Sequence, residues 1–568
     1  MVGGVEAELI SLITVFAVAA GVGVVVAKVG RFPYTIALLL AGLAVSVLGI
    51  DIDIVLTHDL ILLVLLPPLL FEGAATTDLE RFRDNLLPTV ALAVVGLIVS
   101  VALLGAVGSR LLDLPLLVAL VFAAMILPTD PVSVLALFEE LGAPDRLSML
   151  VEGESLINDG VGVVLFSALL AVVAESGTDP ATLLATQRLV AVGTDIVVSS
   201  LGGLVVGTAA GYGVYGVMVN LDEHMTEIVL TLLLAYGSFL VAEHYLGVSG
   251  VIATVGAGLF IGNRGAEYAM SPQTKISVFN TWDTAAFLVN TLVFVLIGAK
   301  TPIDQLLAHA RLIAVAIPLV LAARAVVVYP IVTAVNQQLT RAIPLSYQHV
   351  MVWGGLHASI PIALVLGLPP DFPFQTELRA MVFGVAAFSL VVQGLTMSTL
   401  LDYLDVVTRS EAEELYELLV GRARAIDAAL DTAADLDRRN EVPTAVYEAF
   451  TEEYQREKEA LDDAISELLT EHPDIRREEL LVGERRLLQE EKSAIMDAMR
   501  SGVVADDVGE RLLEEVNIKL DHVRDGESTV VGEQEGFEEF WRAGANEFGL
   551  DGVDRPAADG SSEGTDEA

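Results

Sequence analysis

The sequence predicts an all-α polytopic membrane protein followed by an acidic helical tail. The mean hydropathy is +0.63, 54 % of the 568 residues are hydrophobic, and apolar runs of about twenty residues recur through the first 400 positions. A membrane β-barrel would instead show alternating segments of about ten residues. The formal net charge is −43, and about 46 of the 75 acidic residues follow Leu400. We therefore expect a transmembrane domain over residues 1–404 and an acidic tail after it.

Thirteen apolar segments are long enough to be membrane spans. They cover residues 9–27, 34–50, 58–75, 86–109, 115–138, 147–174, 189–218, 225–245, 248–262, 283–299, 310–336, 347–368 and 377–402. Because thirteen is odd, the two ends of the domain are expected on opposite sides of the cell membrane.

Basic residues predict the orientation, because they are more frequent in cytoplasmic connections. With the N-terminus outside, the inner connections hold Lys28, Arg31, Arg81, Arg83, Arg146, Arg264, Lys275, Arg341 and Arg409. The outer connections then hold Arg110, Arg188, Lys300, Arg311 and Arg379. The inner side has more, so we expect the N-terminus outside and the tail in the cytoplasm.

Two spans are interrupted by residues that disfavour a continuous helix. Span 5 contains Pro128-Thr129-Asp130-Pro131, and span 12 contains Gly354-Gly355 and Pro361. These spans hold the fifth place in two blocks of six, spans 1–6 and 8–13. Interruptions at corresponding positions predict inverted six-helix repeats, in which two interrupted helices cross near the membrane midplane and face a transported ion.

The acidic tail is predicted to form a cytoplasmic helical domain over residues 405–550 and a disordered segment over 551–568. The acidic balance of the whole chain is typical of a halophile. No basic stripe is present, which argues against a nucleic-acid partner. The chain has no cysteine, which excludes disulfides and thiolate metal sites. No nucleophile–base cluster is evident either, so we expect a transporter without a cofactor and not an enzyme.

Span 6 carries the polar groups that need a function. Glu154, Ser155, Asn158 and Asp159 fall within about 140 degrees of one helix face, and Gly162 on the same arc would let another backbone approach. Carboxylates in the hydrocarbon region are costly and usually functional.

The break in span 5 suggests what those groups do. If it lies opposite span 6, Thr129, Ser155 and Asp159 form an oxygen cage suited to a hard monovalent cation. The same carboxylate can bind a proton, so the two ions compete for it. Competition at a site that faces each side of the membrane in turn is sufficient for exchange.

Several motifs resemble those of the monovalent cation:proton antiporters of the NhaP and eukaryotic sodium/proton exchanger branch. The resemblance covers all thirteen predicted spans and leaves out the tail. It rests on Val151-Glu152-Gly153-Glu154-Ser155-Leu156-Ile157-Asn158-Asp159-Gly160, Pro128-Thr129-Asp130-Pro131, Leu66-Pro67-Pro68-Leu69-Leu70-Phe71-Glu72, Ser249-Gly250-Val251, Phe287-Leu288-Val289-Asn290 and Val392-Gln393-Gly394-Leu395-Thr396.

The resemblance implies a homodimer with a mobile core domain and a static dimer domain. It also implies that Asp159 carries the ion and the proton, that Thr129 and Ser155 lend oxygens, and that Asp130 holds the crossed half-helix ends. The Asn158-Asp159 pair is similar to that of the branch considered electroneutral, which exchanges one ion for one proton. The transported cation would be Na⁺, with Li⁺ and K⁺ as further candidates. We interpret Glu72 as a structural residue near the inner face.

One position departs from the family pattern. His357 stands where members usually have an arginine that pairs with the glutamate matching Glu154. Glu154 could then be neutral, pair with His357 as imidazolium, or pair with Arg324, a basic residue deep within span 11. A K⁺/H⁺ antiporter, a cation channel and a receptor-like scaffold remain as alternatives, although no repeated filter loop of a channel is visible.

Overall fold

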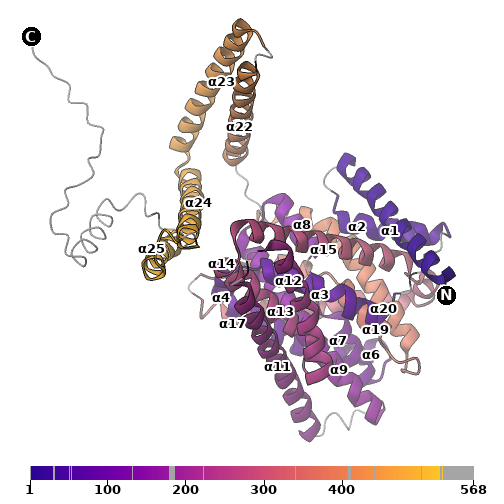
Figure 1. The fold of residues 1–568 in the computed structure, drawn as a ribbon. Helices are drawn as coiled ribbons and strands as arrows, with labels where there is room; N and C mark the ends of the chain where they lie inside the picture. The colour runs from indigo at the N-terminus through magenta and orange to yellow at the C-terminus, as the bar shows by residue number, and fades with distance from the viewer. Residues whose placement is uncertain are drawn as a thin grey trace, which may run out of the picture. The chain divides into compact units, whose positions relative to one another are not determined.

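The chain forms two compact units, Met1–Thr408 and Arg409–Ala568, and each is described by itself. The computed structural model describes residues 2–29, 32–49, 52, 54, 56–130, 132–177, 186–219, 221, 223–339, 341–406, 411–439, 442–500, 502–524 and 528. These residues form helices and connections without a strand (Figure 1), which confirms the all-α prediction. The segment 551–568, predicted to be disordered, lies outside the described residues.

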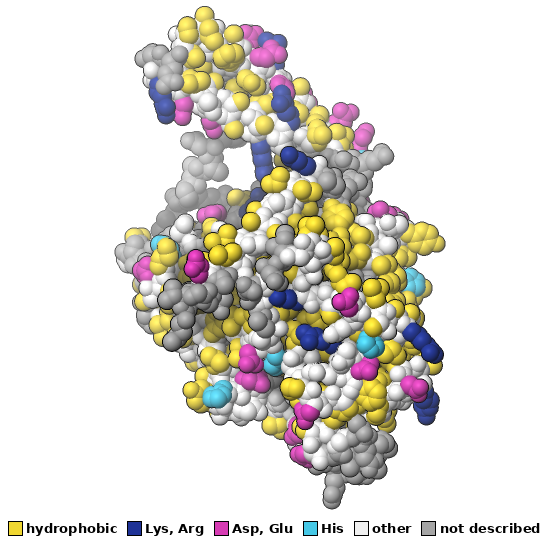
Figure 2. All heavy atoms as spheres, turned by 90° about the vertical axis from the view of Figure 1, so that its right-hand side faces the viewer, with side chains coloured by type: hydrophobic (Ala, Val, Ile, Leu, Met, Phe, Trp, Pro, Cys, Tyr) yellow, Lys and Arg dark blue, Asp and Glu magenta, His cyan; other side chains and the backbone are white. Residues whose placement is uncertain are grey.

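The first unit contains the predicted membrane spans. Among the described residues, eight helices are long and apolar enough to cross a membrane, and three shorter apolar helices accompany them. Each of the thirteen predicted segments overlaps a helix or a run of consecutive helical segments. Figure 2 shows that hydrophobic side chains cover broad areas of one face. Apolar side chains such as Val24, Val25 and Leu201 are more than half exposed, as expected for helices that contact lipid.

One group of helices, here called the α15 bundle, consists of α15, helices that pack on it and helices that pack on α3, α12 or η4. Its helices, with π-helical segments marked η, are α1 (Val2–Val29), α2 (Tyr34–Val47), η1 (Leu60–Leu65), α3 (Leu66–Thr76), α12 (His224–Leu240), η3 (Val241–Leu246), α13 (Gly250–Phe260), η4 (Ile261–Gly265), α14 (Ala266–Tyr268) and α15 (Pro272–Ala299). Glycines allow close packing here. A Cβ on Gly42 of α2 would lie 2.2 Å from the carbonyl oxygen of Val295 on α15, which is the small-residue contact typical of membrane helices.

A second group, here called the α7 bundle, consists of the almost fully buried α7, helices that pack on it and helices that pack on these in turn. Its helices are α5 (Leu86–Val90), η2 (Ala91–Gly96), α6 (Leu97–Leu111), α7 (Leu116–Ile126), α8 (Val132–Leu141), α9 (Asp145–Ser176), α16 (Ile303–Ala308), α17 (Ala310–Val335), α18 (Leu345–Trp353), α19 (Ser359–Leu366), α20 (Gln375–Phe388), η5 (Ser389–Gln393) and α21 (Gly394–Tyr403). The short α4 (Leu79–Asp84) connects the two bundles along the chain. The long α11 (Thr186–Met218) contacts α13 of one bundle and α9 of the other.

The start of span 10 was predicted wrongly. The helix begins at Pro272, not at residue 283, and Ser271 caps it by accepting a hydrogen bond from the backbone N–H of Thr274 at 3.3 Å. A serine cap followed by proline is a strong helix start. Hydropathy does not indicate this start, because the first turns carry polar residues such as Gln273 and Lys275.

Both predicted interruptions are present, and they lie together. The first separates α7 from α8, and the second separates α18 from α19. The backbone N–H of Asp130 in the first break donates to the carbonyl of Leu356 in the second, at 2.8 Å. Four half-helix ends therefore meet at one point, which confirms the crossed interrupted helices.

The second unit consists of two helical hairpins. Helix α22 (Glu411–Arg438) packs on α23 (Thr444–Glu471), and α24 (Pro473–Arg500) packs on α25 (Asp506–Arg524). Exposed ion pairs such as Arg422–Glu457 at 2.7 Å join the first hairpin, and pairs of this kind contribute little stability. A small apolar cluster of Leu488, Val516 and Val523 joins the second.

Candidate ion-binding site

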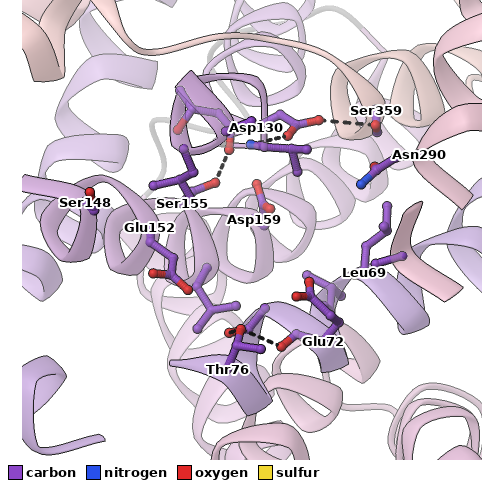
Figure 3. A pocket seen from close by; sticks show the side chains of 18 of the residues that line it. Leu69, Glu72, Thr76, Asp130, Ser148, Glu152, Ser155, Asp159, Asn290 and Ser359 are labelled. Carbon is purple, nitrogen blue, oxygen red and sulfur yellow. Dashed lines mark hydrogen bonds between the residues drawn. The ribbon is translucent and has the colours of Figure 1, made fainter. Parts of the chain in front are cut away.

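A cavity of about 680 Å³ separates the two bundles around the crossing point. Helices α3 and α15 line one side, and α8, α9 and α19 line the other (Figure 3). Its acidic lining residues are Glu72, Asp130, Glu139, Asp145, Glu152, Asp159 and Asp283, and no basic side chain is among the described residues that line it. The cavity reaches the protein surface at Glu139 and Asp145, which are exposed. Its charge attracts cations and repels anions.

The break between α7 and α8 is held in place by α9. Asn158 Nδ2 donates to Thr129 Oγ1 at 3.0 Å, and the backbone N–H of Thr129 donates to Asn158 Oδ1 at 3.4 Å. The hydroxyl of Ser155 donates to the carbonyl oxygen of Thr129. All three residues are buried. The amide of Asn158 is thus used to position the break, while the oxygens of Thr129 and Ser155 keep lone pairs toward the cavity.

Asp130 joins the two half-helices that start at the crossing. One carboxylate oxygen accepts from the backbone N–H of Val132 at 3.1 Å, and the other accepts from the hydroxyl of Ser359 at 3.3 Å. Val132 and Ser359 are the first residues of α8 and α19. A negative charge is favourable beside the positive ends of two helices, so the crossing itself accounts for the charge of Asp130.

The carboxylate of Asp159 differs from that of Asp130, because one of its oxygens accepts no hydrogen bond from the described residues. Asp159 lies one turn after Ser155 on α9, faces the cavity and is only 8 % exposed. Its Oδ1 is buried and has no hydrogen-bond partner among the described residues. An unpaired buried acceptor is rare and indicates an ion, proton or water that completes it. Gly162 lets α9 approach the break at Pro128 closely, because a Cβ there would lie 2.4 Å from Pro128 Cγ.

Glu154 pairs with Arg324, which was one of the three alternatives left open by the sequence. The guanidinium makes two contacts with the carboxylate, Nη1 to Oε1 at 3.0 Å and Nη2 to Oε2 at 3.2 Å, while its Nε donates to the carbonyl of Met351 at 2.9 Å. Gly355 leaves room for this side chain, because a Cβ there would lie 2.4 Å from Arg324 Nε. The pair is buried and its charges cancel.

His357 lies inside the crossing and hydrogen-bonds to groups outside that ion pair. Its Nδ1 is 3.2 Å from the carbonyl oxygen of Pro128, and its backbone N–H donates to Ser389 Oγ at 3.0 Å. A carbonyl only accepts hydrogen bonds, so Nδ1 carries a proton and donates. The imidazole therefore satisfies a carbonyl that the break after α7 leaves without a helical partner.

A glutamine at position 357 should preserve this role, because its amide can donate to the same carbonyl. We expect His357→Gln to keep exchange within about threefold with an unchanged pH profile, and His357→Leu to lose about 1–3 kcal/mol of stability because the Pro128 carbonyl stays unpaired. Flux measured across pH and thermal unfolding of both variants check this. A pH profile that shifts in His357→Gln would show that the imidazole titrates during transport.

Part of the cavity wall does not follow from the sequence motifs. Glu72, interpreted as structural, lines the cavity, as do Glu152 and Asp283. Glu152 accepts a hydrogen bond from Thr77 Oγ1 at 2.9 Å. Helical spacing on α15 could have indicated one of them, because Asp283 and Asn290 are seven residues apart and share a face. Within the described residues no group of three or more His, Cys, Asp or Glu side chains is arranged to hold a metal ion.

Comparisons with known proteins agree with this geometry. The family described as "Sodium/hydrogen exchanger, transmembrane" matches residues 13–403. The Na⁺/H⁺ antiporter NhaG of Bacillus atrophaeus is 34 % identical over 522 residues, which cover 89 % of this chain and 97 % of that protein. The Na⁺/H⁺ antiporter ApNhaP of Aphanothece halophytica is 38 % identical over 403 residues, which cover 70 % of this chain and 75 % of that protein.

The fold is also similar to a solved structure, that of the sodium proton antiporter MjNhaP1 of Methanocaldococcus jannaschii. The TM-score is 0.57 at 18 % sequence identity, and the similarity covers 71 % of this chain and 99 % of that one. The family match covers more than half of the chain and includes both broken helices and the residues of the crossing. The chain therefore belongs to the sodium/hydrogen exchanger family of membrane transporters.

Proposed function

We propose that the protein exchanges Na⁺ for H⁺ across the cell membrane by alternating access, with Asp159 carrying each ion in turn. The observation that carries this proposal is the buried, unpaired carboxylate oxygen of Asp159, which faces a wide acidic cavity. A carboxylate in such a place is stable only with a bound proton or a bound cation. The names of the relatives support Na⁺ as the cation.

The cation contacts Asp159, Ser155 and Thr129. Ser155 uses its proton on the carbonyl of Thr129 and Thr129 accepts one from Asn158, so both hydroxyl oxygens have lone pairs left for an ion. Oxygen ligands of this kind suit small monovalent cations. Asn158 and Asp130 position the half-helices, and the Glu154–Arg324 pair stabilises the α7 bundle.

The charges of the site support a one-for-one exchange. Glu154 is compensated by Arg324, and Asp130 lies at two helix N-termini. Among the described residues at the crossing, Asp159 is then the carboxylate that is left to exchange a proton for a cation. Each cycle moves one positive charge in each direction, so transport is electroneutral, and the protein acts without a cofactor.

The α7 bundle moves against the α15 bundle and exposes the site to each side in turn. The α15 bundle serves as the dimer interface. With the N-terminus outside, the α8–α9 connection is cytoplasmic, so the cavity in this structure opens to the cytoplasm, where the acidic tail also lies.

Flux assays in proteoliposomes test this function. We expect a Na⁺ gradient to drive proton movement, with smaller or no response to K⁺, and a rate that is unchanged when the membrane voltage is collapsed. A strong voltage effect would contradict one-for-one exchange, and preference for K⁺ would identify a K⁺/H⁺ antiporter.

Competition at a single carboxylate also predicts how pH changes the half-saturating Na⁺ concentration. Below the pH at which Asp159 gains its proton, each Na⁺ must displace one H⁺, so that concentration should rise about tenfold per pH unit of acidification while the maximal rate changes less. Initial rates at several Na⁺ concentrations and pH values measure the slope. A slope of about 100-fold per unit would mean two protons per ion.

A further inference from the structure

His58 makes a hydrogen bond that joins the two bundles. It lies just before η1 in the α15 bundle, and its Nδ1 is 3.1 Å from the carbonyl oxygen of Ala363 on α19 of the α7 bundle. The acceptor belongs to the last turn of α19, and it also accepts from the backbone N–H of Gly367 at 3.0 Å. The imidazole therefore adds a second hydrogen bond to a carbonyl near the end of a helix that belongs to the other bundle.

Gly367 makes this contact possible. A Cβ at position 367 would lie 2.4 Å from Nδ1 and 2.7 Å from Cγ of His58. The backbone of Gly367 has φ −79° and ψ −5°, a conformation open to any residue, so the backbone does not require glycine there. The requirement is the space for the imidazole ring.

The contact lies at the end of the bundle interface opposite the cavity mouth. The chain runs from His58 through η1 and α3 to Thr76, which lines the cavity. At the α-helical rise of about 1.5 Å per residue, this path is at most about 27 Å long, because the residues of η1 are π-helical. The cavity reaches the surface at Glu139 and Asp145, whereas here η1 and α19 pack directly on each other.

We propose that His58 and the α19 end around Ala363 and Gly367 form a latch that seals the outer side of the transporter while the cavity is open to the other side. This inference rests on the proposed function. To expose Asp159 to the outer side, the α7 bundle must move against the α15 bundle, and the latch must part. The contact then forms and breaks once in every transport cycle.

A disulfide across the latch tests whether it must open. The chain has no cysteine, so the pair His58→Cys and Gly367→Cys would be the sole thiols. Cβ of residue 58 is one bond from the Cγ position, which brings the two Cβ atoms within the roughly 4.5 Å that a disulfide spans. In proteoliposomes we expect oxidation to link the pair and to reduce Na⁺/H⁺ exchange at least about tenfold, and a reductant to restore it.

Matched controls show whether a loss of flux comes from the cross-link or from the oxidant or the single substitutions. His58→Cys alone and Gly367→Cys alone should each show the same flux before and after treatment with the same oxidant. An oxidised pair that transports like the reduced pair would overturn the latch, and so would failure of the disulfide to form in folded protein. A cysteine-free parent without any flux would instead contradict the proposed function.

A milder change gives a second measurement that needs no cross-link. Gly367→Ala should displace the imidazole and favour outward opening, which lowers the half-saturating external Na⁺ concentration about threefold or more. Gly237→Ala is the control, because a Cβ there meets no atom within 4 Å. An equal effect of both substitutions, or no effect of Gly367→Ala, would contradict the latch.

Discussion

Replacing Asp159 with asparagine should abolish Na⁺-driven proton flux while the protein stays folded. Asparagine has nearly the same shape but carries no charge and no exchangeable carboxyl proton. Loss of about 3 kcal/mol or more of charge interaction with the ion corresponds to a decrease of at least about 100-fold. The unpaired Oδ1 of Asp159 makes no hydrogen bond in the fold, so the thermal midpoint should be unchanged or raised, because a neutral amide is less costly to bury.

The control for this variant is Asp113→Asn. Asp113 is exposed and has a φ of 57°, a conformation that asparagine adopts readily, so both flux and stability should match the parent protein. The measurement is dye-reported proton flux in proteoliposomes, together with thermal unfolding in detergent. Flux of Asp159→Asn similar to that of the parent would show that the ion and the proton use a different group.

Replacing Arg324 with methionine should destabilise the protein strongly, because it leaves the carboxylate of Glu154 buried without its partner. The side chains of Arg324 and Glu154 are 10 % and 6 % exposed. Removing one partner of such a buried pair costs about 3–5 kcal/mol. We expect a large fall in the thermal midpoint and in the yield of folded protein, and flux should fall in proportion to the folded fraction.

The double variant Arg324→Met with Glu154→Gln tests whether the loss of stability comes from the unpaired charge of Glu154. It removes both charges, so most of the lost stability should return, although the carbonyl of Met351 loses its donor. Arg311→Met on the same helix is the matched control, because Arg311 is exposed and should contribute little. Additive losses in the double variant would show that the two residues do not depend on each other.

Local signals predicted most of the membrane unit. Long apolar runs located the helices, because each span must satisfy its backbone hydrogen bonds within itself. Pro128 and the Gly354-Gly355 pair located both breaks, because these residues disfavour a continuous helix wherever they stand. Gly162 was correctly expected at a close approach, which is to Pro128. The first turns of α15 were not predicted. They are polar, so hydropathy gives no signal there, and helix propensity is too weak to identify them.

These local signals could not predict which side chains pair with each other. Glu154 and Arg324 are 170 positions apart in the chain, and the spacing of residues within each helix could not choose between Arg324 and His357 as the partner. The same holds for Glu72, Glu152 and Asp283, which come from three helices and line one cavity. His58 and Gly367 gave no signal at all, since neither stands in a polar or interrupted motif.

The sequence by itself determined that this chain spans the membrane many times, breaks two of its helices and buries a carboxylate at position 159, because hydropathy and backbone restrictions act within short segments. Only the tertiary structure decided which charges cancel, which carboxylate stays unpaired and which end of the bundle interface is sealed. Those outcomes depend on distances between helices far apart in the chain, and packing sets these distances.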